Sequence, residues 1–179
     1  MRVFNLPNTI TITRIIIIPV FTTAIIYYRY DYALYLFIIA SVSDFLDGLI
    51  ARVKDQKTML GTFLDPLADK FLLVTTFILF AIYGLIPKWV AITVISRDLI
   101  VLTGWFLLYM ITHNSKVEPV IMGKIAIASQ MITLTYILLT VNIRPLPPVP
   151  DILLFFTAMV TALSGLQYIY KGFKLTNAL

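Results

Sequence analysis

Six apolar runs, each close to 20 residues long, follow one another along this chain and constrain its fold more than any other feature. A helix of about 20 apolar residues spans the hydrocarbon core of a bilayer. Apolar residues make up 60% of the 179 residues, and the mean hydropathy of +0.93 is far above that of soluble domains. The runs lie at 9–28, 32–51, 60–84, 86–112, 120–142 and 150–170. We therefore expect an all-α integral membrane protein with six transmembrane helices, folded as the single domain 1–179.

The segment before the first run, "MRVFNLPNTITITR", has mixed character. Pro7 and Asn8 are typical of a helix start, and Arg14 interrupts the apolar residues. We expect a short N-terminal interfacial segment that leads into the first span. No small-residue cleavage site follows the run, so we expect it to be retained as a span and not removed as a signal peptide.

The basic residues outside the runs predict the orientation, because cytoplasmic segments of membrane proteins are enriched in Lys and Arg. Seven lie on the side of the two termini and three on the other side. The seven are Arg2, Arg52, Lys54, Lys57, Lys116, Lys171 and Lys174, and the three are Arg29, Lys88 and Arg144. This imbalance predicts that both termini are cytoplasmic.

Four aspartates lie at the ends of the second and third runs, on either side of a short polar turn. Asp44 and Asp47 are three residues apart, and Asp65 and Asp69 are four apart, so that each pair occupies one face of its predicted helix. Two antiparallel helices would bring the four carboxylates together just inside the cytoplasmic boundary. The sequence thus predicts an acidic site there.

Four neighbouring carboxylates near a membrane repel one another and are expensive to desolvate, so they must be protonated, paired or bound to cations. The chain has no cysteine, and its one histidine is not near this stretch. Ligand sets made only of oxygen favour hard divalent ions, so the site is predicted to bind Mg²⁺ or Mn²⁺, with room for two ions. Such ions commonly act on phosphate.

Other interpretations of these residues remain open. Gly48 and Gly61 could serve only to pack helices, and acids near a loop could serve only as helix caps. A small cation transporter could also bury acids, but here they collect at one face of the membrane. The net charge of +5 is explained by topology and lipid headgroups, so no nucleic acid is expected as a partner.

Written out, residues 44–69 read D-x2-D-G-x2-A-R-x8-G-x3-D-x3-D. All eight fixed positions resemble the signature of the CDP-alcohol phosphatidyltransferase family. The entry segment "LPNTITITRIIIIPVF" and the six runs are also similar to that family. The segments "SRDLIV", "GKIAIASQ" and "TALSGLQYIYKG" resemble the branch that makes phosphatidylglycerophosphate or cardiolipin.

The resemblance implies that an alcohol hydroxyl displaces CMP from CDP-diacylglycerol. In the family, residues matching Asp44, Asp47 and Asp65 ligate a pair of divalent ions, and the residue matching Asp69 lies beside them as the proposed general base. All four acids are therefore candidate metal ligands, with Asp69 the candidate catalytic residue. The positions that match the family's CDP-binding residues are Asp44, Gly48, Ala51, Arg52 and Gly61.

The acceptor alcohol is expected to bind outside the acidic motif, at Arg97 and Lys124, which could bind a phosphate group. Alternatively, Arg97 pairs with Asp98 or extends to the interface, as Lys124 could also do. Phosphatidylglycerophosphate synthases often carry further basic residues where this chain has Trp105 and Ala126. Fewer basic residues suit an acceptor with less phosphate charge, such as phosphatidylglycerol, which is the alternative. We expect glycerol 3-phosphate as acceptor because its synthase is the commoner member of this branch; inositol phosphate and serine are weaker options.

The resemblance further implies a homodimer among membrane lipids, in the bacterial inner (plasma) membrane, with the active site facing the cytoplasm.

Overall fold

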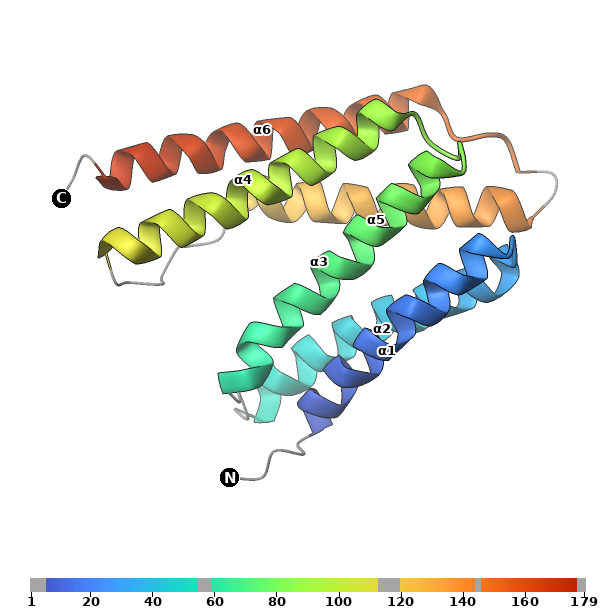
Figure 1. Ribbon diagram of the computed structural model, residues 1–179, viewed down its shortest axis with the longest axis horizontal. Helices are drawn as coiled ribbons and strands as arrows, with labels where there is room; N and C mark the ends of the chain where they lie inside the picture. The colour runs from blue at the N-terminus through green and yellow to red at the C-terminus, as the bar shows by residue number, and fades with distance from the viewer. Residues whose placement is uncertain (1–5, 55–58, 113–119, 144–145, 177–179) are drawn as a thin grey trace. The chain divides into compact units, whose positions relative to one another are not determined.

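The computed structural model of the protein describes residues 6–54, 59–112, 120–143 and 146–176. Over 6–12, 44–54 and 59–69, and at 14, 105, 108, 109, 111, 112, 173, 175 and 176, it describes the helix backbone alone. Every regular element in these residues is an α-helix (Figure 1). The helices are α1 (Leu6–Ile26), α2 (Tyr30–Lys54), α3 (Met59–Ile82), α4 (Lys88–Thr112), α5 (Ile121–Asn142) and α6 (Asp151–Thr176). The all-helical class is therefore confirmed, with one helix at each predicted apolar run.

The predicted N-terminal segment and the first apolar run belong to one helix. Helix α1 is continuous from Leu6 to Ile26 and includes Arg14, so that no break separates an interfacial segment from the first apolar run. Pro19 lies inside this helix, where it cannot donate a backbone hydrogen bond. Whether the start of α1 lies at a membrane surface stays a prediction.

The contacts divide the chain into two compact units. The first comprises Met1–Leu79 and Leu138–Leu146, and the second comprises Phe80–Ile137 and Pro147–Leu179. The predicted metal motif belongs to the first unit, whereas Arg97 and Lys124 belong to the second.

In the first unit, α1 packs against α2 (Figure 1). Phe21 is fully buried, as is Phe37, and their ring centroids lie 6.2 Å apart. Ala33 and Ala40 lie four residues before and three after Phe37 and are also buried, which gives α2 one apolar face of mixed large and small residues. Tyr28 connects the helices in a left-handed conformation with φ of 56°.

In the second unit, α4 packs against α6. Trp89 stacks on Phe155 with ring centroids 5.0 Å apart, and Val90 and Val94 are fully buried one turn apart on α4. Helix α6 begins with Asp151 and has Lys174 in its last turn, charges that complement the helix dipole at each end.

Two stretches of the described residues, Ile121–Asn142 and Asp151–Gly172, are helical, long and apolar enough to cross a membrane. Shorter apolar helices cover Ile15–Ile26, Tyr30–Ser43 and Lys70–Ile82. The count of six transmembrane helices therefore stays a prediction, while the six helices themselves are observed.

Candidate functional site

A row of small polar side chains is buried on one face of α6. Thr157, Thr161 and Ser164 are all fully buried. They are spaced by four and then three residues, which places them in one stripe along the helix. Buried hydroxyl groups need hydrogen-bond partners, and each member of this stripe has one on another helix.

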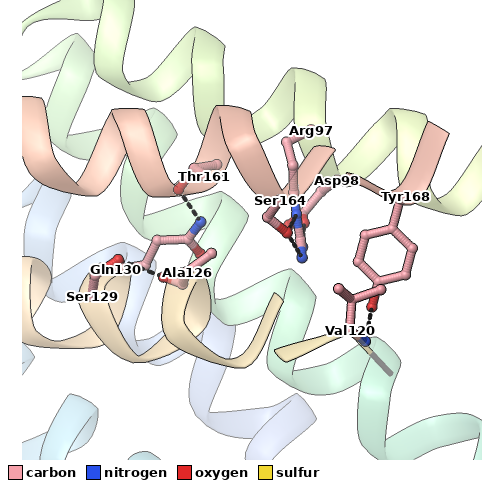
Figure 2. A network of polar contacts seen from close by, with 9 residues as sticks. All are labelled: Arg97, Asp98, Val120, Ala126, Ser129, Gln130, Thr161, Ser164 and Tyr168. Atoms are coloured by element: carbon pink, nitrogen blue, oxygen red, sulfur yellow. Dashed lines mark hydrogen bonds and ion pairs between the residues drawn. The ribbon is translucent and has the colours of Figure 1, made fainter. Parts of the chain in front are cut away.

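Helix α5 supplies two of those partners. The Gln130 amide nitrogen donates to Thr161 Oγ1 at 3.0 Å, and the hydroxyl oxygens of Thr133 and Thr157 lie 2.7 Å apart. From Gln130 to Thr133 along α5, the bonded residue on α6 changes from Thr161 to the earlier Thr157, so the two helices run antiparallel along this polar seam. Figure 2 shows the bond from Gln130 to Thr161.

Arg97 on α4 extends the polar seam by one more turn (Figure 2). Its Nη1 donates to Asp98 Oδ1 at 2.6 Å, and the two side chains are only 5% and 7% exposed. Its Nε and Nη2 both donate to Ser164 Oγ, at 3.3 and 2.9 Å. The guanidinium charge is thus balanced by the neighbouring carboxylate inside the second unit, and a neutral hydroxyl fixes its other edge.

An aromatic ring and two glycines lie next to the Arg97 side chain. Arg97 Cζ lies 5.6 Å from the centroid of the Tyr168 ring, within the range of a cation–π contact. A Cβ atom on Gly123 would lie 3.2 Å from Arg97 Nη2 and from the Tyr168 hydroxyl. One on Gly165 would lie 3.3 Å from Arg97 Cγ. A larger residue at either position would be in tight contact, and Arg97 or Tyr168 would have to shift by a few tenths of an ångström.

The two predicted acceptor residues are therefore in different surroundings. Arg97 is buried and ion-paired with Asp98, as one of the alternatives from the sequence had it. Lys124 follows Gly123 directly on the first turn of α5, but its side chain is exposed. The structure brings Arg97 to the start of α5, next to Gly123, which precedes Lys124, and the described contacts of Arg97 do not include Lys124.

The predicted metal and CDP residues all lie within helices of the first unit. Asp44, Asp47, Gly48, Ala51 and Arg52 are in the last part of α2, and Gly61, Asp65 and Asp69 are in the first part of α3. Their side chains lie outside the part of the chain whose side chains the structure describes. The continuous helices do agree with the spacing argument, since residues three or four apart on a helix share a face. Among the residues with described side chains, no cluster of three metal-binding groups occurs.

Sequence reasoning missed Ser164, Gly165 and Tyr168 as neighbours of Arg97. The signal that could have revealed Ser164 is the spacing of Thr157, Thr161 and Ser164 along an otherwise apolar helix. Hydroxyl residues in such a stripe commonly bond across helix interfaces in membranes. Which helix they meet depends on packing, which spacing alone does not give.

Comparison with known sequences identifies the family. The CDP-alcohol phosphatidyltransferase family matches this chain over residues 4–166. The chain belongs to this family. The resemblance carried by residues 44–69 is therefore confirmed, and with it the enzyme class of a CDP-alcohol phosphatidyltransferase.

Two kinds of relative are similar to this CDP-alcohol phosphatidyltransferase. CDP-diacylglycerol–glycerol-3-phosphate 3-phosphatidyltransferase from Bacillus subtilis is 35% identical and covers 96% of both chains. The protein of the same name from Salmonella typhimurium is 35% identical over 93% of both. A provisionally named cardiolipin synthase from Mycobacterium tuberculosis is 32% identical, over 77% of this chain and 66% of its own.

Family membership also bears on the metal ion and on the membrane. CDP-alcohol phosphatidyltransferases generally depend on a divalent metal ion, and in bacteria they are bound to membranes. The particular ligands, the number of ions and the topology of this chain stay predictions.

Proposed function

We propose that this protein transfers the phosphatidyl group of CDP-diacylglycerol to glycerol 3-phosphate, which yields phosphatidylglycerophosphate and CMP. The observation that carries the proposal is the 35% identity, across 96% of both chains, to the Bacillus subtilis enzyme named for that reaction. A similarity that covers the whole length includes both the motif on α2 and α3 and the region of α4, α5 and α6 around Arg97.

The metal site is proposed to consist of Asp44, Asp47 and Asp65, with Asp69 beside them. The residues fit divalent ions because all their donors are carboxylate oxygens and because α2 and α3 are continuous helices through the motif, so that each pair shares a face. When bound, two Mg²⁺ or Mn²⁺ ions would neutralise the pyrophosphate and stabilise the leaving CMP.

The remaining motif residues are proposed to bind the CDP group and to move a proton. Asp44, Gly48, Ala51, Arg52 and Gly61 match the family's CDP positions; the small residues leave room near the helix backbones, and Arg52 can pair with phosphate.

Asp69 accepts the proton of the acceptor hydroxyl, while the oxygen of that hydroxyl forms a bond to the phosphorus that carries diacylglycerol. The bond from that phosphorus to the bridging oxygen breaks, and CMP leaves with the bridging oxygen.

Arg97 and Lys124 are proposed to bind the phosphate of the acceptor. An Arg side chain has five N–H donors, and the described contacts of Arg97 use one for Asp98 and two for Ser164. The two that remain have no partner among the described residues. Lys124, exposed next to Gly123, would add an uncompensated positive charge.

Phosphatidylglycerol is the second candidate acceptor, as in cardiolipin synthesis. It is favoured by one specific observation, the 2.6 Å ion pair in which Asp98 neutralises Arg97, since an acceptor with less phosphate charge needs fewer uncompensated cations. The provisionally named cardiolipin synthase relative agrees with this option.

The membrane setting is proposed to be six transmembrane helices with both termini and the active site at the cytoplasmic face of a bacterial inner membrane, in a homodimer. Support for contact with lipid comes from α6, which buries three hydroxyl side chains while its exposed side chains from 152 to 166 are all apolar. Ile152, Met159 and Leu166 are 78%, 64% and 62% exposed. Apolar exposure opposite polar burial is the pattern expected of a helix that faces lipid.

The test of the reaction is an acceptor assay on the purified protein in detergent with lipid. CDP-diacylglycerol and Mg²⁺ or Mn²⁺ are supplied, glycerol 3-phosphate and phosphatidylglycerol are offered separately, and the lipid product is identified by its mass. We expect CMP release and phosphatidylglycerophosphate with the first acceptor. Product with phosphatidylglycerol alone would replace the first candidate by the second, and no CMP release with either acceptor would contradict both.

A further inference from the structure

The polar seam on α6 raises the question of what each of its hydroxyls does. Thr157 and Thr161 bond neutral side chains of α5, at 2.7 and 3.0 Å, and so join two helices. Ser164 instead bonds the charged side chain of Arg97 through both Nε and Nη2. It is the member of this described stripe that touches a proposed substrate-binding residue.

The two partners of Arg97 have different effects on it. Asp98 sets the charge of the site, because its carboxylate neutralises the guanidinium at 2.6 Å. Ser164 carries no charge, but a single oxygen that accepts from Nε and Nη2 fixes the plane of the guanidinium. Loss of the Ser164 hydroxyl would therefore leave the charge of the Arg97–Asp98 pair unchanged, but the guanidinium of Arg97 would no longer be held in one plane.

The orientation matters because of where Nη2 lies. This nitrogen is the atom that would be 3.2 Å from a Cβ on Gly123, and Gly123 directly precedes Lys124. When Ser164 holds the guanidinium in this plane, the remaining N–H of Arg97 Nη2 lies beside the first turn of α5. Rotation about its side-chain bonds would move that donor away from the start of α5.

We propose that Ser164 is a positioning residue for acceptor binding: it orients Arg97 toward the start of α5 and thereby sets the affinity for an anionic acceptor, without contact with the acceptor itself. This inference rests on the proposed role of Arg97 in acceptor binding. A residue of this kind changes ground-state and transition-state binding equally, so its removal raises KM and leaves kcat unchanged.

The experiment measures kcat and KM for glycerol 3-phosphate and for CDP-diacylglycerol with the full-length purified protein. Ser164→Ala is expected to raise KM for glycerol 3-phosphate roughly tenfold, a size within the usual range of coupling between residues in contact. The kcat and the KM for CDP-diacylglycerol are expected to stay within about twofold. Ser164→Thr retains the hydroxyl and is expected to restore most of the affinity.

Thr161→Val is the matched control. It removes an equally buried hydroxyl one turn away on α6, but one that bonds Gln130 and not Arg97. It is expected to lower thermal stability about as much as Ser164→Ala without a change in KM for the acceptor. If Thr161→Val raises that KM as much as Ser164→Ala does, the effect is general loosening of the seam and the inference is wrong.

A double variant separates this inference from the proposed function. Arg97→Gln with Asp98→Asn removes both charges together, so that no unpaired charge is left buried. If this variant keeps the normal KM for the acceptor, the proposed role of Arg97 is wrong. If it raises KM but Ser164→Ala alone does not, only the positioning role is overturned.

The same double variant tests whether Ser164 acts through Arg97. Ser164→Ala added to it is expected to raise KM no further, because there is no guanidinium left to orient. An additional tenfold rise in that background would overturn the inference.

Discussion

At the scale of single residues, the Arg97–Asp98 pair shows how a charge is kept inside an apolar helix assembly. Removal of one member of a buried ion pair destabilises by about 3–5 kcal/mol because the other charge stays without a partner. With 5% and 7% side-chain exposure, this pair falls in that class. Ser164 and the Tyr168 ring complete the surroundings of the guanidinium.

Asp98→Asn is therefore expected to destabilise the protein more than the double variant Arg97→Gln with Asp98→Asn. The single change leaves a buried positive charge, whereas the double change leaves two neutral amides. Thermal unfolding of both proteins in the same detergent measures the difference. Equal midpoints for the two variants would mean that the pair is not desolvated in the membrane protein.

The proposed division of roles within the acidic motif gives a second residue-scale prediction. Asp69→Asn is expected to lower kcat by about 10²–10⁴, the usual contribution of a general base, and to leave the metal concentration for half-maximal activity unchanged. Asp65→Asn is expected to raise that concentration. The measurement is activity as a function of Mg²⁺ or Mn²⁺ for each variant. Near-normal turnover of Asp69→Asn would exclude it as the base.

At the scale of helices, the sequence predicted the elements well and their neighbours poorly. Each apolar run became a helix, and Lys88–Thr112 falls close to the predicted 86–112, because length and hydrophobicity are local properties. The partner of Ser164 could not be predicted, since it depends on which helices meet in space. The acids at 44–69 could be recognised from the sequence because both their charge in an apolar stretch and their spacing on helix faces are local properties.

The end of α3 illustrates a helix signal that can be tested. Gly84 follows the helix with φ of 72°, and Leu85 N donates to Phe80 O at 2.8 Å across the turn. This left-handed position after a helix favours glycine. Gly104 lies inside α4, and a Cβ there would meet no described atom within 4 Å, as is also true at Gly84.

Alanine at the two glycines is therefore expected to have opposite effects. Gly84→Ala should destabilise by about 1–2 kcal/mol, because the side chain disfavours the left-handed conformation. Gly104→Ala should stabilise by up to ~1 kcal/mol, because alanine is the better helix former. Thermal unfolding of the two variants side by side measures both. Stabilisation by Gly84→Ala would mean that the turn after α3 does not hold this conformation in solution.

At the scale of the whole molecule, apolar helices and charged helix ends occupy different parts of the chain. Among the described residues, two helical stretches, on α5 and α6, are long and apolar enough to cross a membrane. The charged part of the chain lies where the proposed chemistry needs water and metal ions, at the end of α2 and the start of α3. Charged residues at the membrane end of apolar helices are costly to place there, so their presence in this part of the chain agrees with a functional role.

The topology can be tested directly because the chain contains no cysteine, so a single introduced thiol has no background. Asn114→Cys and Asn177→Cys lie in segments predicted to be cytoplasmic, and Pro148→Cys lies in a segment predicted to be outside. A membrane-impermeant maleimide applied to intact cells is expected to label only Pro148→Cys. After the membrane is solubilised, all three should react, which controls for thiol access. Labelling of Asn177→Cys in intact cells would place the C-terminus outside and would contradict the six-span arrangement, since an even number of spans with a cytoplasmic N-terminus returns the C-terminus to the cytoplasm.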